Sequence, residues 1–486
     1  MALMTSKEYV ESLRKMNRKI YFQGKLIEDP INDPILIPSR KCLEETYDMA
    51  LDPQYEDLMT ATSQFTGEKI NRFNNVHRDI NDLIKKVKLQ RLMGQRTAAC
   101  FQRCVIMDMA NAFYSTCFEI DKKYKTNYFE RFKEYIIKCQ REDLIVAGAL
   151  TDPKGSRAYP IGSDEQDKDL YLHVVERRPD GVVVRGAKCH LTGATNAHEV
   201  VVLPTQALRP GQEDYAIAFH IPLDAPGITM ILGRQSCDTR KLEPGADIDL
   251  GNAVYGGVEA LTVFDDVFIP NENIFLDGEV EFAGVLVERF AGYHRNSYGG
   301  CKTGVGDVVI GVAALMAQYN GTEKASHVSD KLIEMTQLNE QLYACGIASS
   351  AEGAPTEAGN YMVNLLLANV CKLNVTRYPY EIVRLMEDIA GGIMVTAPSE
   401  ADLKSPIVGK YVEKYMVGQD VNAENRLRAL RLCENIALGT AAVGYRTESM
   451  HGAGSPQAQK IMIKRQGNLG WKKKLAKRIA GIKDED

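Results

Sequence analysis

The spacing of hydrophobic positions changes twice along the chain. Up to about residue 145, apolar residues recur every three to four positions, as in 97–121, where Val105, Met109 and Phe113 form one stripe. This period predicts helices. Short runs rich in β-branched residues follow, separated by Gly, Pro, Asp and Asn, and they predict strands at 171–176, 181–193, 200–204, 215–223, 228–232 and 261–270. Helical spacing returns at 303–319, 326–349, 375–390 and 422–443.

Helices, then strands, then helices predict an α+β fold. We expect an N-terminal helical domain over residues 1–145, a middle β-barrel or β-sandwich domain over 146–278, and a C-terminal helical bundle over 279–486. No Gly-x-Gly-x-x-Gly segment opens a helix after a strand, and Lys302-Thr303 follows Cys301 instead of a glycine. These departures exclude a Rossmann domain and a P-loop.

Composition adds limits on partners and location. The 486 residues are 45% hydrophobic and 25% charged, with a net charge of −5, which is ordinary for a globular protein and unlike a nucleic-acid-binding one. No apolar run reaches the about 18 residues of a membrane span. The N-terminus lacks a signal-peptide core, and Thr5 with Glu8 predicts a helix capping box instead. We expect a cytoplasmic protein that binds neither nucleic acid nor membrane.

Cysteine usage points to metal ligands. Eleven cysteines at irregular spacing do not suit a disulfide framework in a cytoplasmic protein. Cys100 and Cys104 are four apart at the start of a predicted helix, so their sulfurs would lie on one face, one turn apart.

A second set of candidate ligands lies in the segment 294–301. His294, Tyr298 and Cys301 share a stripe if the helix runs unbroken through Gly299-Gly300, a pair that would let the backbone approach a bulky group. With Cys100 and Cys104, the two segments supply three thiolates and one imidazole. This ligand set suits a [4Fe–4S] cluster, and it equally suits zinc. The spacing leaves both open.

A family resemblance lies in the β region. Residues 151–156, Thr-Asp-Pro-Lys-Gly-Ser, resemble the flavin-binding segment of acyl-CoA dehydrogenases, although β-turns alone also explain such dipeptides. The segments Gly-Ala-Lys-x-x-x-Thr-Gly at 186–193 and VFDDVFIP at 263–270 match the same superfamily. Over its whole length the chain resembles the 4-hydroxyphenylacetate 3-hydroxylase family, which has an acyl-CoA dehydrogenase-like fold. The four candidate ligands further resemble those of the dehydratase branch of that family.

The resemblance implies FAD, one [4Fe–4S] cluster per subunit and a homotetramer built as a dimer of dimers. The implied FAD contacts are Ala149, Leu150, Thr151, Asp152, Lys154, Gly155, Ser156, Arg157, Lys188 and Thr192. The partner subunit would add Gln318, Ala390, Gly391 and Gly392, where a Gly-rich helix end offers free N–H groups to the pyrophosphate. A plain join between two helices explains this last segment equally well.

The reaction implied is reversible radical dehydration of 4-hydroxybutyryl-CoA to crotonyl-CoA, with vinylacetyl-CoA Δ-isomerase activity. The hydrogen lost from the β carbon is not acidified by the thioester carbonyl, so an ordinary general base cannot remove it. A flavin, which accepts single electrons, removes this obstacle. Two alternatives remain open: a flavin-dependent aromatic hydroxylase that needs no metal ligands, and a non-catalytic flavin and iron–sulfur electron carrier.

The catalytic candidates gather around the ligands. Among the four candidate ligands, His294 is the one that is not a thiolate. The iron that it binds could open to substrate oxygen, and His294 is also a candidate base. Tyr298 would donate a hydrogen bond to a substrate oxygen, and Glu448 is a candidate carboxylate base. The resemblance also supports Glu259 and Lys302, and His451 is a secondary candidate. For each charged residue taken alone, a surface position is the simpler interpretation.

Overall fold

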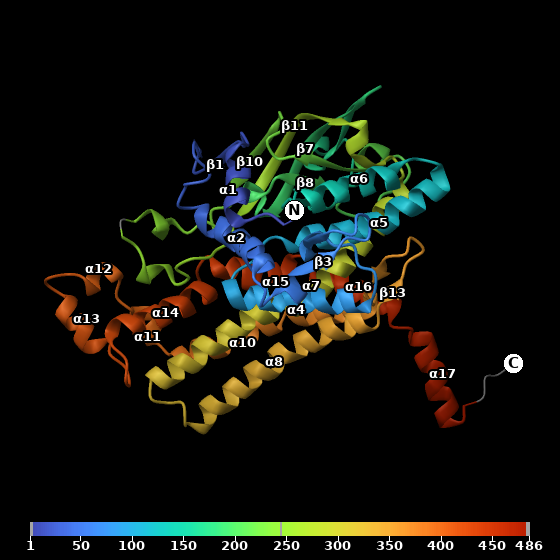
Figure 1. Cartoon of the computed structure of the whole chain (residues 1–486). Helices are drawn as coiled ribbons and strands as arrows, with labels where there is room; N and C mark the ends of the chain where they lie inside the picture. Colours follow the sequence, from blue (N-terminus) through green and yellow to red (C-terminus); the bar gives the residue numbers. More distant parts are fainter. Residues whose placement is uncertain (1–2, 244, 483–486) are drawn as a thin grey trace.

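The computed structural model describes residues 3–243 and 245–482, and it shows a β region at the top of the view with helices from the N- and C-terminal parts packed beneath it (Figure 1). The N-terminal part contains α1 (Ser6–Arg14), α2 (Ile37–Leu51), α4 (Ile80–Thr97), α5 (Cys104–Tyr124) and α6 (Tyr128–Arg141). The capping box predicted at Thr5 and Glu8 is present at the start of α1. The helix–β–helix fold class predicted from the sequence is confirmed.

The β region is built from two packed sheets. The larger has the order β2-β1-β10-β11-β7-β6, with β6 at His173–Arg178, β7 at Gly181–Thr192, β10 at Ile228–Leu232 and β11 at Glu259–Pro270. The smaller has the order β12-β9-β8-β5, at Ile274–Asp277, Ile217–Pro222, Glu199–Val202 and Val146–Ala149. The rings of Phe219 and Phe264 meet between the sheets, 6.2 Å apart.

The N-terminal region is not purely helical. Its β1 (Ile20–Phe22) pairs in parallel with β10, and β2 (Lys25–Leu26) continues the sheet beyond it. A small hairpin, β3 (Thr60–Thr62) with β4 (Lys69–Asn71), lies between α2 and α4. The N-terminal segment therefore also extends the edge of the β domain.

Helix α7 (Val280–Tyr319) is the central element of the C-terminal part. It packs against α4, α5, α8 (Ser326–Ala351), α9 (Leu365–Val375) and α10 (Tyr378–Ala390). Its length and apolar composition would suffice to cross a membrane, but here most of it is buried among these helices. The remaining helices are α11 (Ile393–Thr396), α12 (Glu400–Leu403), α13 (Gly409–Tyr415), α14 (Ala423–Ala437), α15 (Glu448–His451), α16 (Pro456–Gln466) and α17 (Leu469–Ala480).

The helix α7 runs unbroken through Gly299 and Gly300. A Cβ at Gly299 would lie 2.6 Å from the Gly346 Cα of α8, and one at Gly300 would lie 2.3 Å from the Val87 carbonyl of α4. The two glycines therefore let neighbouring helices approach α7. The expectation that they admit a bulky group was wrong.

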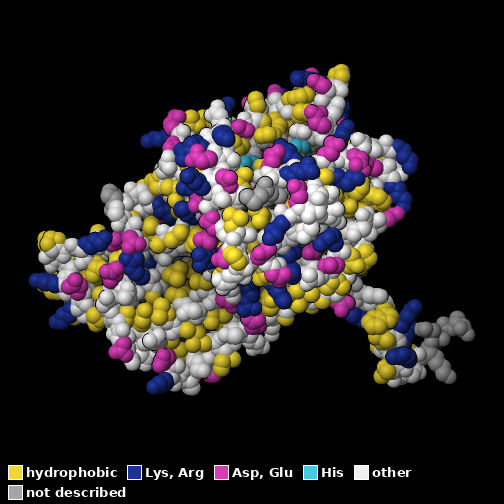
Figure 2. Space-filling model, in the orientation of Figure 1, with side chains coloured by type: hydrophobic (Ala, Val, Ile, Leu, Met, Phe, Trp, Pro, Cys, Tyr) yellow, Lys and Arg dark blue, Asp and Glu magenta, His cyan; other side chains and the backbone are white. Residues whose placement is uncertain are grey.

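Helix α17 projects from the body of the molecule and buries none of its residues (Figure 1). Leu469, Trp471 and Ile479 are exposed on it, and basic side chains lie among them (Figure 2). Elsewhere on the face drawn in Figure 2, acidic and basic side chains are intermixed. A helix that exposes apolar side chains is typical of a segment that packs against another chain.

Candidate functional site

A cavity of about 270 Å³ lies where the β region meets the helices, and we call it the large cavity. The β region contributes Leu150, Thr151, Cys189, His190, Thr192 and Glu259 to its lining. Helix α7 contributes Phe290, His294 and Tyr298, and the C-terminal segment contributes Thr447, Glu448 and His451. Cys100 and Cys104 complete one side. Most of the predicted catalytic residues therefore share one space.

The three predicted thiol ligands meet in a smaller adjoining cavity. Cys100, Cys104 and Cys301 all line it, together with Lys302. The prediction that Cys100 and Cys104 share a helix face was wrong, because α4 ends at Thr97 and α5 begins only at Cys104. Between them the chain turns at Ala98 and Gln102, both with positive φ, and this turn brings Cys100 back beside Cys104.

The surroundings keep the metal-free thiols protonated. Burial, with neighbouring negative groups, raises the pKa values of Cys100 and Cys104 well above normal and that of Cys301 to about 11. Iron or zinc would displace these protons on binding, because the thiolate is the ligand. Within the described part of the chain, no three His, Cys, Asp or Glu side chains are close enough to hold a single metal ion.

His294 is held by a buried charge network. Its Nδ1 lies 2.7 Å from Oδ2 of Asp108, whose Oδ1 lies 2.5 Å from Nζ of Lys86. Ser297 donates to the same carboxylate at 3.0 Å. Burial raises the pKa of Asp108, but Lys86 and His294 lower it by more. The net pKa is below normal, so the carboxylate stays ionised. With Nδ1 fixed, Nε2 is left free for a metal or a proton, an arrangement frequent among metal-binding histidines.

Glu259 and Glu448 form an acidic pair beside the thiols. Thr192 donates to Oε1 of Glu259 at 2.7 Å, while Oε2 of Glu259 has no partner within the described residues. Burial and repulsion from the neighbouring Glu448 raise the pKa of Glu259 well above normal. Lys302 lies 2.9 Å from Oε2 of Glu448. The pair therefore combines a neutral acid, Glu259, with a carboxylate paired to a cation, Glu448.

Lys302 remains charged although it is buried. Burial lowers its pKa, but Glu448 and the sulfurs of Cys301 and Cys100 raise it more, so the net pKa is above normal. The ammonium therefore adds a fixed positive charge beside the thiols and the carboxylate. Such a charge stabilises negative charge that develops nearby.

Two buried lysines contact the ring of Tyr298. Nζ of Lys302 is 5.2 Å from the centre of its ring, and Nζ of Lys372 is 4.9 Å from it. Burial and the nearby Glu448 raise the pKa of Tyr298 well above normal, so the phenol stays protonated and can donate a hydrogen bond. Lys372 also donates to the Ser449 carbonyl at 2.6 Å, which ties Tyr298 to the segment of Glu448.

Because Gly452 has no side chain, the hydroxyl of Tyr298 can occupy the space beside it. A Cβ at this position would lie 2.0 Å from Oη of Tyr298. We expect Gly452→Ala to displace the ring and lower kcat by about 10- to 100-fold, as misplacement of a catalytic group by about 1 Å does. Steady-state kinetics of Gly452→Ala, with Gly470→Ala as the control in open space, measure this effect. If the substitution is as harmful in a Tyr298→Phe background, the clash with the hydroxyl is not the cause.

The predicted flavin segment lies partly at the large cavity. Leu150 and Thr151 line it, whereas Gly155, Ser156 and Arg157 are exposed. Lys188 is buried, forms an ion pair with Asp152 at 2.8 Å, and donates to the Leu150 carbonyl at 3.1 Å. The side chain of Lys188 therefore holds the flavin segment in place. Because its ammonium already bonds to protein groups, it is not expected to contact the cofactor directly.

The second predicted flavin segment lies elsewhere in the subunit. Gln318 is near the end of α7, and the next residue but one, Asn320, donates to the Ile389 and Ala390 carbonyls at the end of α10. Gly391, which ends α10, has a φ of 81°. None of Gln318, Ala390, Gly391 and Gly392 lines the large cavity. They are close to one another but separate from the thiols.

The sequence reasoning missed four residues of this site: Asp108, Lys86, Lys372 and Gly452. Asp108 had a usable signal, since it follows Cys104 by four positions on one helix face. Lys86 and Lys372 are basic residues within predicted helices, and a solvent-exposed position is the usual interpretation of such lysines. Only the tertiary structure shows that both are fully buried.

Comparison with known proteins places these features in a family. The N-terminal model of 4-hydroxyphenylacetate 3-hydroxylase matches residues 5–276, and the C-terminal model matches residues 283–481. The chain is 62% identical over 490 residues to a 4-hydroxybutyryl-CoA dehydratase/vinylacetyl-CoA-Delta-isomerase of Clostridium aminobutyricum. The match covers 99% of this chain and 100% of that protein.

Comparison with solved structures gives the same family. An oxygen-tolerant archaeal 4-hydroxybutyryl-CoA dehydratase from N. maritimus superposes with a TM-score of 0.97 at 51% identity, covering 99% of this chain and 96% of that one. The oxygenase component of 4-hydroxyphenylacetate 3-monooxygenase, complexed with FAD, has a TM-score of 0.87 at 23% identity, with 98% of each chain covered. At that identity, the second similarity concerns the fold.

Proposed function

Since the chain belongs to the 4-hydroxyphenylacetate 3-hydroxylase family, we propose that it acts as a dehydratase of that family. It converts 4-hydroxybutyryl-CoA reversibly to crotonyl-CoA and water, and it isomerises vinylacetyl-CoA to crotonyl-CoA, the activities named for its 62% identical relative. The observation that carries the proposal is the meeting of three thiols and an anchored imidazole beside an acidic pair. An aromatic hydroxylase has no use for that ligand set.

The cofactors we propose are FAD and one [4Fe–4S] cluster. The thiols of Cys100, Cys104 and Cys301 with Nε2 of His294 would hold the cluster. FAD would lie in the large cavity against Leu150, Thr151 and Thr192. When bound, these groups supply one-electron chemistry that acidifies the β hydrogen and a Lewis-acidic iron for the substrate hydroxyl.

The residues of the chain then move protons and hold the substrate. Glu448, as a carboxylate held by Lys302, accepts a proton from the substrate carbon chain. Glu259, held neutral by burial and by Glu448, donates a proton to the leaving hydroxide or to the γ carbon. Tyr298 donates a hydrogen bond to a substrate oxygen. The apolar part of the lining, including Phe290 and Leu150, keeps bulk water away from these steps.

Removal of the Asp108 carboxylate should loosen the cluster. We expect Asp108→Asn to weaken iron retention by about 10- to 100-fold, because a ligating histidine loses its charged acceptor. The measurement is the rate of iron loss to a chelator under anaerobic conditions. Since Lys86 would then be buried without a counter-ion, a double variant, Lys86→Met with Asp108→Asn, is compared. If this double variant retains iron like the wild type, Asp108 serves only to balance Lys86.

We also propose a homotetramer that assembles as a dimer of dimers in the cytoplasm. Two observations support assembly. Helix α17 extends from the body of the molecule (Figure 1) and exposes apolar side chains. The segment of Gln318 and Ala390–Gly392 does not line the large cavity of its own subunit. A partner subunit would give both segments a function.

Anaerobic purification followed by a crotonyl-CoA hydration assay tests the proposed function. We expect protein that contains iron, sulfide and flavin, forms 4-hydroxybutyryl-CoA, and isomerises vinylacetyl-CoA. Replacement of Cys301 by Ser should abolish both activities together with the cluster. Protein that carries iron and flavin but leaves both thioesters unchanged would contradict the proposal and support an electron carrier instead.

A further inference from the structure

A second, much smaller cavity lies behind the acidic pair, and we call it the small polar cavity. It shares Cys100, Glu259, Val443 and Glu448 with the large cavity. Its other polar lining residues are Ser236, Lys241, Asn252, Tyr255, Asn435 and Thr440. The two carboxyl groups therefore lie between two compartments, one large enough for an acyl chain and one that is not.

The volume of the small polar cavity is about 20 Å³. A cavity needs about 10–15 Å³ and two to four polar partners to hold one water molecule. The space therefore suits a single water molecule and excludes a larger ligand.

Two polar groups in this lining have no partner within the described residues. Oε2 of Glu259 is buried and accepts no hydrogen bond. The ammonium of Lys241, which is only partly buried, forms no ion pair or hydrogen bond within the described residues. Most other polar groups are satisfied: Ser236 accepts from the Glu259 N–H at 3.0 Å, and Asn252 donates to the Thr97 carbonyl at 2.9 Å. One water molecule would satisfy both free groups, as an acceptor for Lys241 and a donor to Glu259.

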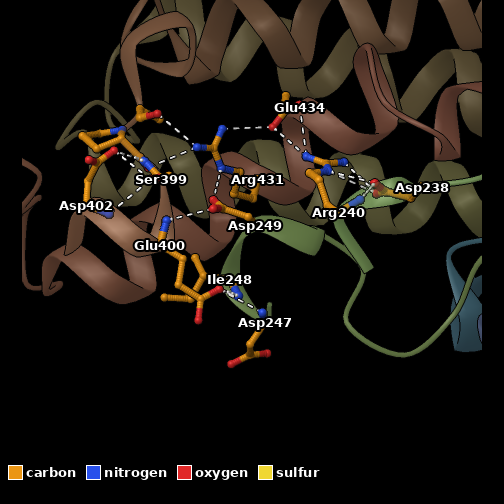
Figure 3. A network of polar contacts seen from close by, with 12 residues as sticks. Asp238, Arg240, Asp247, Ile248, Asp249, Ser399, Glu400, Asp402, Arg431 and Glu434 are labelled. Carbon is orange, nitrogen blue, oxygen red and sulfur yellow. Dashed lines mark hydrogen bonds and ion pairs between the residues drawn. The ribbon is translucent and has the colours of Figure 1, made fainter. Parts of the chain in front are cut away.

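The wall that carries Lys241 is fixed firmly to the helices. Asp249 accepts from Arg431 of α14 at 2.8 Å, and Glu400 of α12 accepts from the Asp247 and Ile248 N–H groups, both at 2.8 Å (Figure 3). Arg240, next to Lys241, is held by Asp238 at 2.8 Å and lies close to Glu434 (Figure 3). These contacts tie the loop after β10 to α12 and α14. The backbone of Lys241 is therefore held in a fixed position.

The proposed reactions differ in whether they make water. Dehydration takes one proton from the α carbon and one from the β carbon, adds one to the γ carbon, and expels hydroxide that takes the other. Isomerisation of vinylacetyl-CoA takes a proton from the α carbon and returns one to the γ carbon. Only the first needs a place for a product water, and hydration of crotonyl-CoA needs the same place for a substrate water.

We propose that the small polar cavity is the water site of the dehydratase reaction, where Lys241 and Glu259 receive the water formed and supply it in reverse. This proposal rests on the proposed function. The carboxyl of Glu259 gives its proton to the leaving hydroxide and regains one from the neighbouring Glu448, which has taken a proton from the carbon chain. The ammonium of Lys241 then donates a hydrogen bond to the water formed, and the large cavity is thereby cleared of water. Lys241 acts on water alone and does not touch the acyl chain.

Two variants test this site by comparison of two activities of one enzyme. Lys241→Met removes the ammonium. Gly257→Val places a side chain in the small polar cavity, and it should do so without a clash because a Cβ at Gly257 meets nothing within 4 Å. We expect the ratio of dehydratase to isomerase kcat to fall at least about tenfold, the equivalent of one lost charge-assisted hydrogen bond. Gly311→Val, on an open face of α7, is the control, and its ratio should stay that of the wild type.

The outcomes separate the two proposals. Parallel loss of both activities, or no change in their ratio, would overturn the water site while leaving the dehydratase function intact. Absence of both activities from the wild type would instead overturn the proposed function. A crystal structure of the cofactor-loaded wild type gives an independent reading: we expect one ordered water within hydrogen-bond distance of Lys241 Nζ and Glu259 Oε2, and an empty cavity there contradicts the proposal.

Discussion

Replacement of His294 by Ala should lower both activities at least about a thousandfold, since it removes a ligand and a candidate proton acceptor together. The side chain connects the two parts of the site. Its Nδ1 is fixed by Asp108, and its side chain lines the large cavity together with Cys100 and Cys104. The measurement is kcat for vinylacetyl-CoA isomerisation together with iron and sulfide content.

Matched variants separate these two roles. His327→Ala alters an exposed histidine of α8 and should leave both activities unchanged. His294→Cys offers a fourth thiolate, so we expect it to retain more iron than His294→Ala while activity stays low. Full activity of His294→Ala with its iron intact would refute both roles at once.

Glu448→Gln should lower both activities by about 100- to 1,000-fold, the usual contribution of a general base. The amide retains the shape of the side chain but cannot take a proton. The pKa of Lys302, raised mainly by Glu448, should then fall. We expect flavin and iron contents to remain those of the wild type, so that kcat falls much more than KM rises.

The control for this variant is Glu413→Gln, which changes an exposed carboxylate of α13 in the same way. Its kinetics should match the wild type. If Glu448→Gln retained kcat within a factor of about three, the base would have to be sought elsewhere, and Nε2 of His294 would be the remaining candidate within the large cavity.

Local spacing predicted the fold class and the stripe of His294, Tyr298 and Cys301, whereas the resemblance to a known family supplied most of the other site residues. Period-two runs gave β6 to β11 within a few residues, and the two-turn spacing of His294, Tyr298 and Cys301 holds because α7 is continuous. Spacing failed at Cys100, where positive φ at Ala98 and Gln102 bends the chain out of a helix. A hydrophobic pattern does not predict such a turn at non-glycine residues.

The rest of the site depends on contacts between distant segments. Lys86 meets Asp108 from another helix, and Lys372 reaches Tyr298 from α9. Each is a lysine that sequence reasoning assigns to solvent. Burial with specific partners is a property of the folded chain, so these residues became visible only in three dimensions.

The most direct test of the central claim is ⁵⁷Fe Mössbauer spectroscopy of the anaerobically purified protein. The account predicts about four irons per subunit in one [4Fe–4S] cluster, with one iron distinct from the other three because His294 replaces a thiolate there. Protein that contains zinc in place of iron, or four equivalent irons, would contradict it.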